Sequence, residues 1–109
     1  MKINITSRHF KAKESLQELI NSKIEELSKY NEDILHADVI LFYDKPPLDI
    51  KHCEVSIKLK DKILTSKESA EDFERAVDRV IEKIDKQIYK YKDKHKAKKH
   101  NNPAKYKSI

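Results

Sequence analysis

The segment from Glu71 to about His95 constrains this chain most, because its apolar residues recur at the spacing of an amphipathic helix. They are Phe73, Val77, Val80, Ile84, Ile88 and Tyr91. A helix of about seven turns with one apolar stripe has to bury that stripe against another layer of structure. The segment therefore predicts a fold in which a long helix lies on a sheet or on other helices.

The charges of this predicted helix are sorted into two rows. The first, which we call the basic row, consists of Arg79, Lys83, Lys86, Lys90 and Lys94. The second, the acidic row, consists of Asp78, Glu82 and Asp85. A helix that needs only solubility more often interleaves its signs as pairs four residues apart. The segregation is the main functional signal of the sequence, although a charge run is also typical of a plain solvated face.

The excess positive charge of the chain lies at one end. Residues 1–69 carry 12 Lys or Arg and 12 Asp or Glu, whereas residues 70–109 carry 12 and 7. A positive field concentrated in this way indicates a polyanionic partner: nucleic acid, an acidic protein surface or an anionic membrane. The basic residues are mostly Lys, which suits phosphate contacts that position a partner without reading its sequence.

Several classes of enzyme are excluded by the complete absence of glycine. Phosphate-binding loops of the Walker or dinucleotide type need glycine, and so does the nucleophile elbow of hydrolases. The five histidines include no pair four residues apart and have no Cys at metal-ligand spacing. No Ser–His–Asp arrangement can be argued from the sequence. We therefore expect no enzyme activity, cofactor, metal site or small-molecule substrate.

The chain has the features of a cytoplasmic protein. No apolar run approaches the roughly 20 residues that span a bilayer. The start, MKINITSRHF, lacks the apolar core of a secretory signal. Cys53 is the only cysteine and lies in an alternating apolar run, so we expect a small buried hydrophobe there. No interaction with a membrane is expected.

The remaining segments predict an α+β fold of order β-α-β-β-β-α. Strands are expected at Lys2–Thr6, His36–Tyr43, His52–Leu59 and Ile63–Ser66, and the first helix at Lys13–Tyr30. The last three strands have short connections and should form an antiparallel meander. Both helices have one apolar stripe, so we expect a two-layer sandwich, with a four-stranded sheet and two helices packed on one face.

Local details follow from the same patterns. Ser15 with Glu18 is a candidate capping box for the first helix, and Ser69 with Asp72 a candidate cap for the second. The centre of His36–Tyr43 is apolar on both faces, which predicts a well-covered central strand. Residues 1–95 should form the single domain, and residues 96–109 a disordered basic tail.

Lys23 lies within the apolar stripe of the first helix. Either its stem packs while its ammonium reaches solvent at the edge, or it is placed there for a contact. Two helices side by side leave a groove, across which we expect Lys23 to face the basic row. Tyr89 projects away from the apolar stripe of the second helix, where it either stacks on a base or is simply exposed. The strands lack the exposed aromatic pairs of an RRM.

At this point the sequence resembles a known family over residues 1–96. The run EDFERAVDRVIEKIDKQIYKYKDK is similar to the ribosome hibernation-promoting factor and ribosome-associated inhibitor A family, also labelled sigma-54 modulation proteins. NITSRHF, LQELINSKIEELSKY and VILFYD also match in place. The resemblance implies binding to ribosomal RNA of the small subunit, in the channel for messenger and transfer RNA. Such binding would block translation and protect idle ribosomes during stationary phase or stress.

The resemblance also implies which residues contact the RNA. The role carries over by position to Lys23, Lys83, Lys86, Gln87, Lys90 and Lys94, and less tightly to Arg79 and Lys29. The chain departs from the family pattern at Lys13, Glu26, Phe73 and Glu74. Glu26 replaces a common lysine and removes one possible contact on the first helix. Without the second domain of long members, the chain is expected to be a monomer off the ribosome and not to pair ribosomes unaided.

Two rival hypotheses remain open. The basic helix could dock on an acidic protein partner such as a sigma factor. A weaker alternative is a general binder of duplex RNA.

Overall fold

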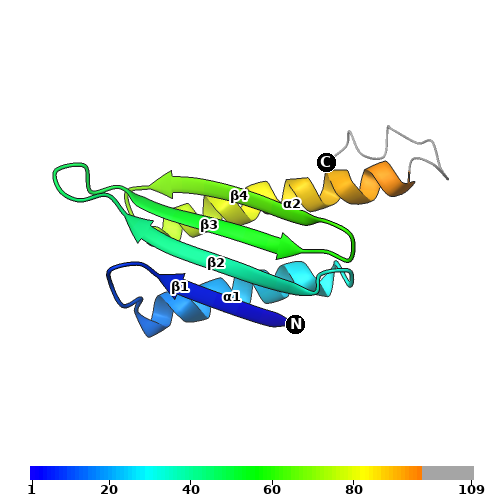
Figure 1. Cartoon of the computed structure of the whole chain (residues 1–109), viewed down its shortest axis with the longest axis horizontal. Helices are drawn as coiled ribbons and strands as arrows, with labels where there is room; N and C mark the ends of the chain where they lie inside the picture. Colours follow the sequence, from blue (N-terminus) through cyan, green and yellow to red (C-terminus); the bar gives the residue numbers. More distant parts are fainter. Residues whose placement is uncertain (97–109) are drawn as a thin grey trace.

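Four strands and two helices follow one another in the expected order in the computed structural model, which describes residues 1–96 (Figure 1). They are β1 (Lys2–Ser7), α1 (Glu14–Lys29), β2 (His36–Tyr43), β3 (Lys51–Lys58), β4 (Ile63–Ala70) and α2 (Phe73–Lys96). The α+β prediction is therefore confirmed. The predicted tail, residues 96–109, lies outside the described residues except for Lys96. The side chains at the end of α2 are described as far as Asp93.

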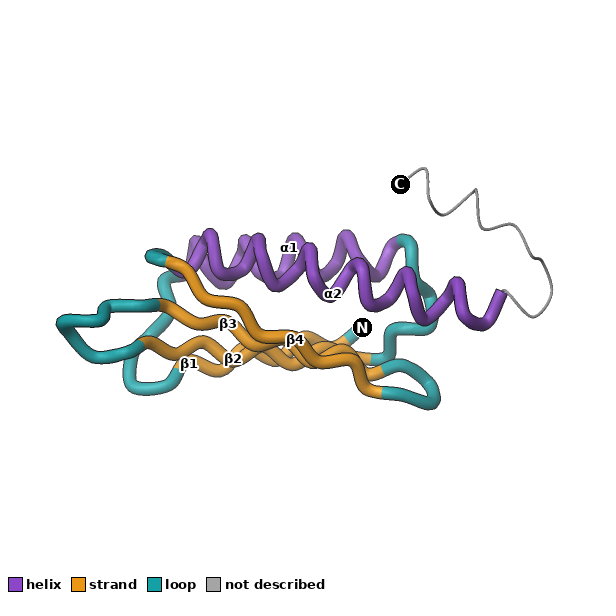
Figure 2. Tube along the Cα trace, turned by 90° about the horizontal axis from the view of Figure 1, so that it is seen from above, coloured by secondary structure: helices purple, strands orange, loops and turns teal. Residues whose placement is uncertain are grey.

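The sheet has the strand order β1-β2-β3-β4. β1 and β2 are parallel because α1 connects them as a crossover, and Lys2 pairs with His36. β2, β3 and β4 form the predicted antiparallel meander, in which Val39 pairs with Val55 and Val55 with Ser66. Both helices cover the same face of this sheet, with α2 lying along β3 and β4 (Figure 2).

The core lies between the sheet and the helices because alternate strand residues point to the covered face. The sheet contributes Ala37, Val39, Leu41, Cys53, Val55 and Ile57. The helices contribute Leu16, Ile20, Ile24, Leu27, Val77, Val80, Ile84 and Ile88. Burying one such Leu, Ile or Val side chain is worth about 1.5–3 kcal/mol, so the two apolar stripes hold the layers together.

The second face of the sheet is uncovered by helices, contrary to the expectation of a well-covered β2. Phe42 on this face is only partly buried. It stacks on the imidazole of its cross-strand neighbour His52, with ring centroids 4.7 Å apart. Arg8 lies 5.4 Å and Lys67 5.9 Å from its ring centroid. Neighbouring side chains, rather than a second layer of structure, therefore cover part of the Phe42 ring.

Both predicted caps differ from the observed ones. α1 begins one residue before Ser15, after Lys13, which makes no side-chain capping bond. β4 continues to Ala70 because it pairs with β3 along its whole length, so Ser69 belongs to the strand. Asp72 alone caps α2: its Oδ1 accepts a hydrogen bond from the backbone N–H of Arg75 at 2.8 Å.

Candidate nucleic-acid interface

The first two members of the basic row, Arg79 and Lys83, lie on the side of α2 that faces β4, and Gln87 lies beside them. Arg79 Nη1 donates a hydrogen bond to the backbone carbonyl of Ser69 at 2.7 Å. One turn later, Lys83 Nζ lies 2.5 Å from Glu68 Oε2. Gln87 Nε2, one turn further, donates to the backbone carbonyl of Thr65 at 3.3 Å. Three successive turns of α2 are thereby tied to β4, which fixes the direction of this side of the helix.

The later members of the row are less constrained. Lys86 Nζ lies 3.5 Å from Glu82 Oε1, in an exposed pair four residues apart. Lys90 is exposed and makes no ion pair within the described residues. The side chain of Lys94 lies outside the described residues, although its backbone continues α2. The row therefore changes from tethered cations near Arg79 to a freer one at Lys90.

Glu68 is an acidic neighbour of the basic row that the sequence did not predict. A helical wheel shows no acidic neighbour for Lys83, but β4 brings one from 15 residues earlier in the chain. Because the Lys83 side chain is 58% exposed, the pair is a surface ion pair, which is worth about 0–1 kcal/mol.

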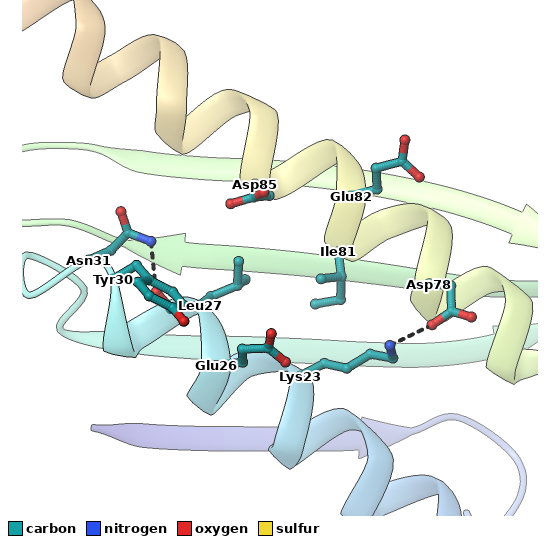
Figure 3. Close-up of a pocket in the computed structure, with 9 residues that line it drawn as sticks. All are labelled: Lys23, Glu26, Leu27, Tyr30, Asn31, Asp78, Ile81, Glu82 and Asp85. Atoms are coloured by element: carbon teal, nitrogen blue, oxygen red, sulfur yellow. Dashed lines mark hydrogen bonds and ion pairs between the residues drawn. The ribbon is translucent and has the colours of Figure 1, made fainter. Parts of the chain in front are cut away.

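Lys23 does not face the basic row, so that prediction is wrong. Its Nζ lies 2.8 Å from Asp78 Oδ1, across the cleft between the helices (Figure 3). All three members of the acidic row line this cleft together with residues of α1, so the acidic row faces α1. Lys29 is exposed near the end of α1 and does not line this cleft. The structure brings Arg79, Lys83 and Gln87 together but separates Lys23 from them.

A hydrogen-bonded chain on the open face was missed by the sequence reasoning. His52 Nδ1 lies 2.8 Å from Ser69 Oγ, and His52 Nε2 lies 3.0 Å from Asp44 Oδ2. The strand register, which pairs His52 with Ser69, would have revealed half of it. A chain of Ser, His and Asp side chains also occurs in serine hydrolases, where hydrogen-bond donors for an oxyanion lie beside the serine hydroxyl. The described contacts show instead a link that ties the loop after β2 to β4.

Among the described residues, the pKa is shifted for two tyrosines and one cysteine. The Tyr91 hydroxyl donates to the carboxylate of Asp61, and this hydrogen bond raises the pKa of Tyr91. It joins α2 to the turn between β3 and β4. Tyr89 is 36% exposed on α2, beside Lys90, and loss of solvent raises its pKa. Burial raises the pKa of Cys53 to about 12, so this residue is an inert core thiol as predicted.

Within residues 1–96, no helix is long and apolar enough to cross a membrane. The same residues contain no group of three or more His, Cys, Asp and Glu side chains arranged to hold a metal ion.

The described residues form a two-layer α+β protein whose second helix carries a row of basic side chains. The chain belongs to the sigma-54 modulation protein / S30EA ribosomal protein family, whose model matches residues 3–96. Members of this family are ribosome-associated proteins, and the family resemblance expected from the sequence is confirmed.

Solved structures give the same fold. A ribosomal subunit interface protein from Coxiella burnetii has 22% sequence identity and a TM-score of 0.78; the match covers 84% of this chain and 98% of that one. The N-terminal domain of Protein Y from Thermus thermophilus has 20% identity and a TM-score of 0.74, covering 84% of this chain and 99% of that domain.

Proposed function

We propose that this protein is a non-enzymatic translation inhibitor of stationary phase or stress, which acts in the cytoplasm as a ribosome hibernation factor. It binds ribosomal RNA of the small subunit, in the channel for messenger and transfer RNA, and is a monomer when free. Family membership supports ribosome association. The observation that carries the RNA contact is the basic row, whose first two members, Arg79 and Lys83, are held towards β4.

The geometry of the row suits a phosphate backbone. At 1.5 Å per residue, Arg79 to Lys94 extend over about 22 Å of one side of α2. Lys ammonium groups are compact point charges that bind phosphate without geometric demands, which favours shape over sequence recognition. Gln87 adds a hydrogen-bonding group within the row, and Tyr89 a ring that can stack on an unpaired base.

The cleft between α1 and α2, which we call the acidic cleft, changes the expected contribution of α1. Its carboxylates are those of Glu26, Asp78, Glu82 and Asp85. Lys23 is paired with Asp78, and Lys29 lies apart from the basic row. We therefore propose that α2 supplies most of the RNA contacts, and that Lys23 and Lys29 add weaker ones from α1. Substituting these two lysines should weaken binding less than substituting any two members of the row.

Charge reversal of the row tests the proposal. The variant K83E/K86E/K90E should no longer co-sediment with purified small subunits, because it replaces attraction to phosphate by repulsion. The control K11E/K45E/K60E makes the same change in net charge at exposed lysines that have no ion pair within the described residues. Both variants should retain the native circular dichroism spectrum. Normal sedimentation of the first variant would rule out the proposed contact surface.

The family description, which includes sigma-54 modulation, supports one rival: docking of the basic row on an acidic protein partner. Pull-downs with and without nuclease separate the two, since only RNA binding is lost on digestion. Competition by naked duplex RNA as strong as that by small subunits would instead indicate a general duplex-RNA binder.

A further inference from the structure

The cleft between α1 and α2 is lined mostly by carboxylates and apolar groups, a chemistry unlike that of the basic row. Its volume is about 490 Å³, and apolar groups of Leu27 and Ile81 contribute to its walls (Figure 3). The ring of Tyr30 stands at one end and is 76% exposed. An open cleft with apolar and aromatic surface is suited to the aliphatic part of a long side chain.

The polar groups of the cleft are mostly carboxylates that come from both helices. Asp78 is paired with Lys23, and Glu82 with Lys86. Glu26 from α1 and Asp85 from α2 have no ion pair within the described residues, and both are exposed. Two like charges on facing helices repel each other, and a cation between them would remove that repulsion.

Two ammonium groups of the chain itself show what fits between the helices. Lys23 Nζ reaches Asp78 on one side, and Lys92 Nζ donates to the backbone carbonyl of Tyr30 at 2.9 Å on the other. Along α2, Asp85 lies two turns from Asp78 and two turns from Lys92. An ammonium group thus connects the two helices at each end of the cleft, and the carboxylates of Glu26 and Asp85, which have no ion pair within the described residues, lie between these two links.

We propose that this cleft is a docking site for a Lys- or Arg-rich peptide segment of a partner protein. The stems of its side chains lie on Leu27 and Ile81, and their charged ends contact Glu26 and Asp85. Tyr30 offers its ring face to a further cation. RNA is disfavoured here because its phosphates would meet carboxylates. Glu26 and Asp85 are not among the proposed RNA contacts, so the peptide site can be tested separately, although Lys23 and Lys86 pair with other carboxylates of the same cleft.

Binding of a fluorescein-labelled hexa-arginine peptide, followed by anisotropy at fixed salt, tests the proposal. The variant E26Q/D85N should weaken binding by about tenfold, because two exposed charge pairs are lost. The control E18Q/E25Q removes the same charge from other exposed positions of α1 and should change affinity less than twofold. Equal weakening in both variants would mean that net charge alone attracts the peptide, and would overturn the proposal. Absence of measurable binding would do the same.

A second measurement locates the peptide. Methyl NMR signals of Leu27 and Ile81 should shift on titration, whereas a shift confined to other methyl groups would contradict the assignment. The chain's own residues 97–109 carry four lysines and are the main competing occupant. If K98Q/K99Q/K105Q/K107Q binds the peptide tenfold more tightly than the native chain, the cleft serves the chain's own tail, and the proposal of a separate partner fails.

Discussion

Cys53 shows how burial decides the chemistry of a single residue. Its side chain is fully buried, and desolvation, with a smaller contribution from the charge of Glu54, raises its pKa from 9.0 to about 12. Since only the thiolate is nucleophilic, the native protein should resist iodoacetamide at pH 8, whereas the unfolded protein should react readily. Mass spectrometry after timed exposure measures both rates. Alkylation of the native protein as fast as that of a free thiol would contradict the buried position.

The same shift predicts a dependence of stability on pH. The thiol ionises more easily in the unfolded chain than in the folded one, so its contribution is fully present below about pH 9 and is lost as pH rises towards 12. Urea denaturation between pH 8 and 11 should show a smaller loss of stability with pH in Cys53→Ala than in the native protein, because Tyr89 and Tyr91, whose pKa values are also raised, still contribute in the variant.

Substitution of Glu68 should raise the affinity for small subunits, whereas charge reversal of the basic row should lower it. If Lys83 binds phosphate as proposed, the Glu68 carboxylate competes for it, so E68Q should strengthen binding to small subunits by about two- to fivefold for a surface pair. The control E18Q makes the same change in net charge on α1, away from the row. Weaker binding by E68Q than by E18Q would show that Glu68 positions Lys83 rather than competing for it.

At the scale of elements, α2 depends on one capping residue. Asp72→Ala removes the acceptor for the N–H of Arg75 and should lower the free energy of unfolding by about 0.5–2 kcal/mol. Asp72→Asn keeps a capping oxygen and should lose much less. Urea denaturation of the three proteins gives the comparison. Equal losses in both variants would point to the charge of Asp72, through the helix dipole or its contact with Arg75, rather than to the cap.

The periodicity of α2, the alternation of β3 and the order of elements were predictable because they depend on neighbouring residues. The true length of β4 was not, since the strand continues as far as β3 pairs with it. A helical wheel separates the acidic row from the basic row but does not say which row faces α1. For the same reason the Lys23–Asp78 and Lys83–Glu68 pairs, and the His52 chain, had to come from the structure.

At the scale of the whole molecule, the proposed RNA contact predicts a steep dependence on salt. Each phosphate contact contributes roughly 0.7 log units of affinity per log unit of salt on the single-strand estimate, so five contacts give a slope of about 3.5. Sedimentation with small subunits over a salt series measures this slope. The single substitution K90Q should lower it by about 0.7, while K60Q should leave it unchanged. A flat salt response would exclude phosphate contacts as the source of affinity.

The two charged rows of α2 also govern how this protein meets a polyanion. With Arg79 and Lys83 towards β4 and the acidic row towards α1, the charges of α2 are separated along the direction that runs from α1 to β4 in Figure 1. For the proposed RNA contact, this separation predicts that an approaching chain of phosphates turns the β4 side towards it and the α1 side away. Docking is thereby aligned before contact, and the face turned outward is the one that holds the acidic cleft.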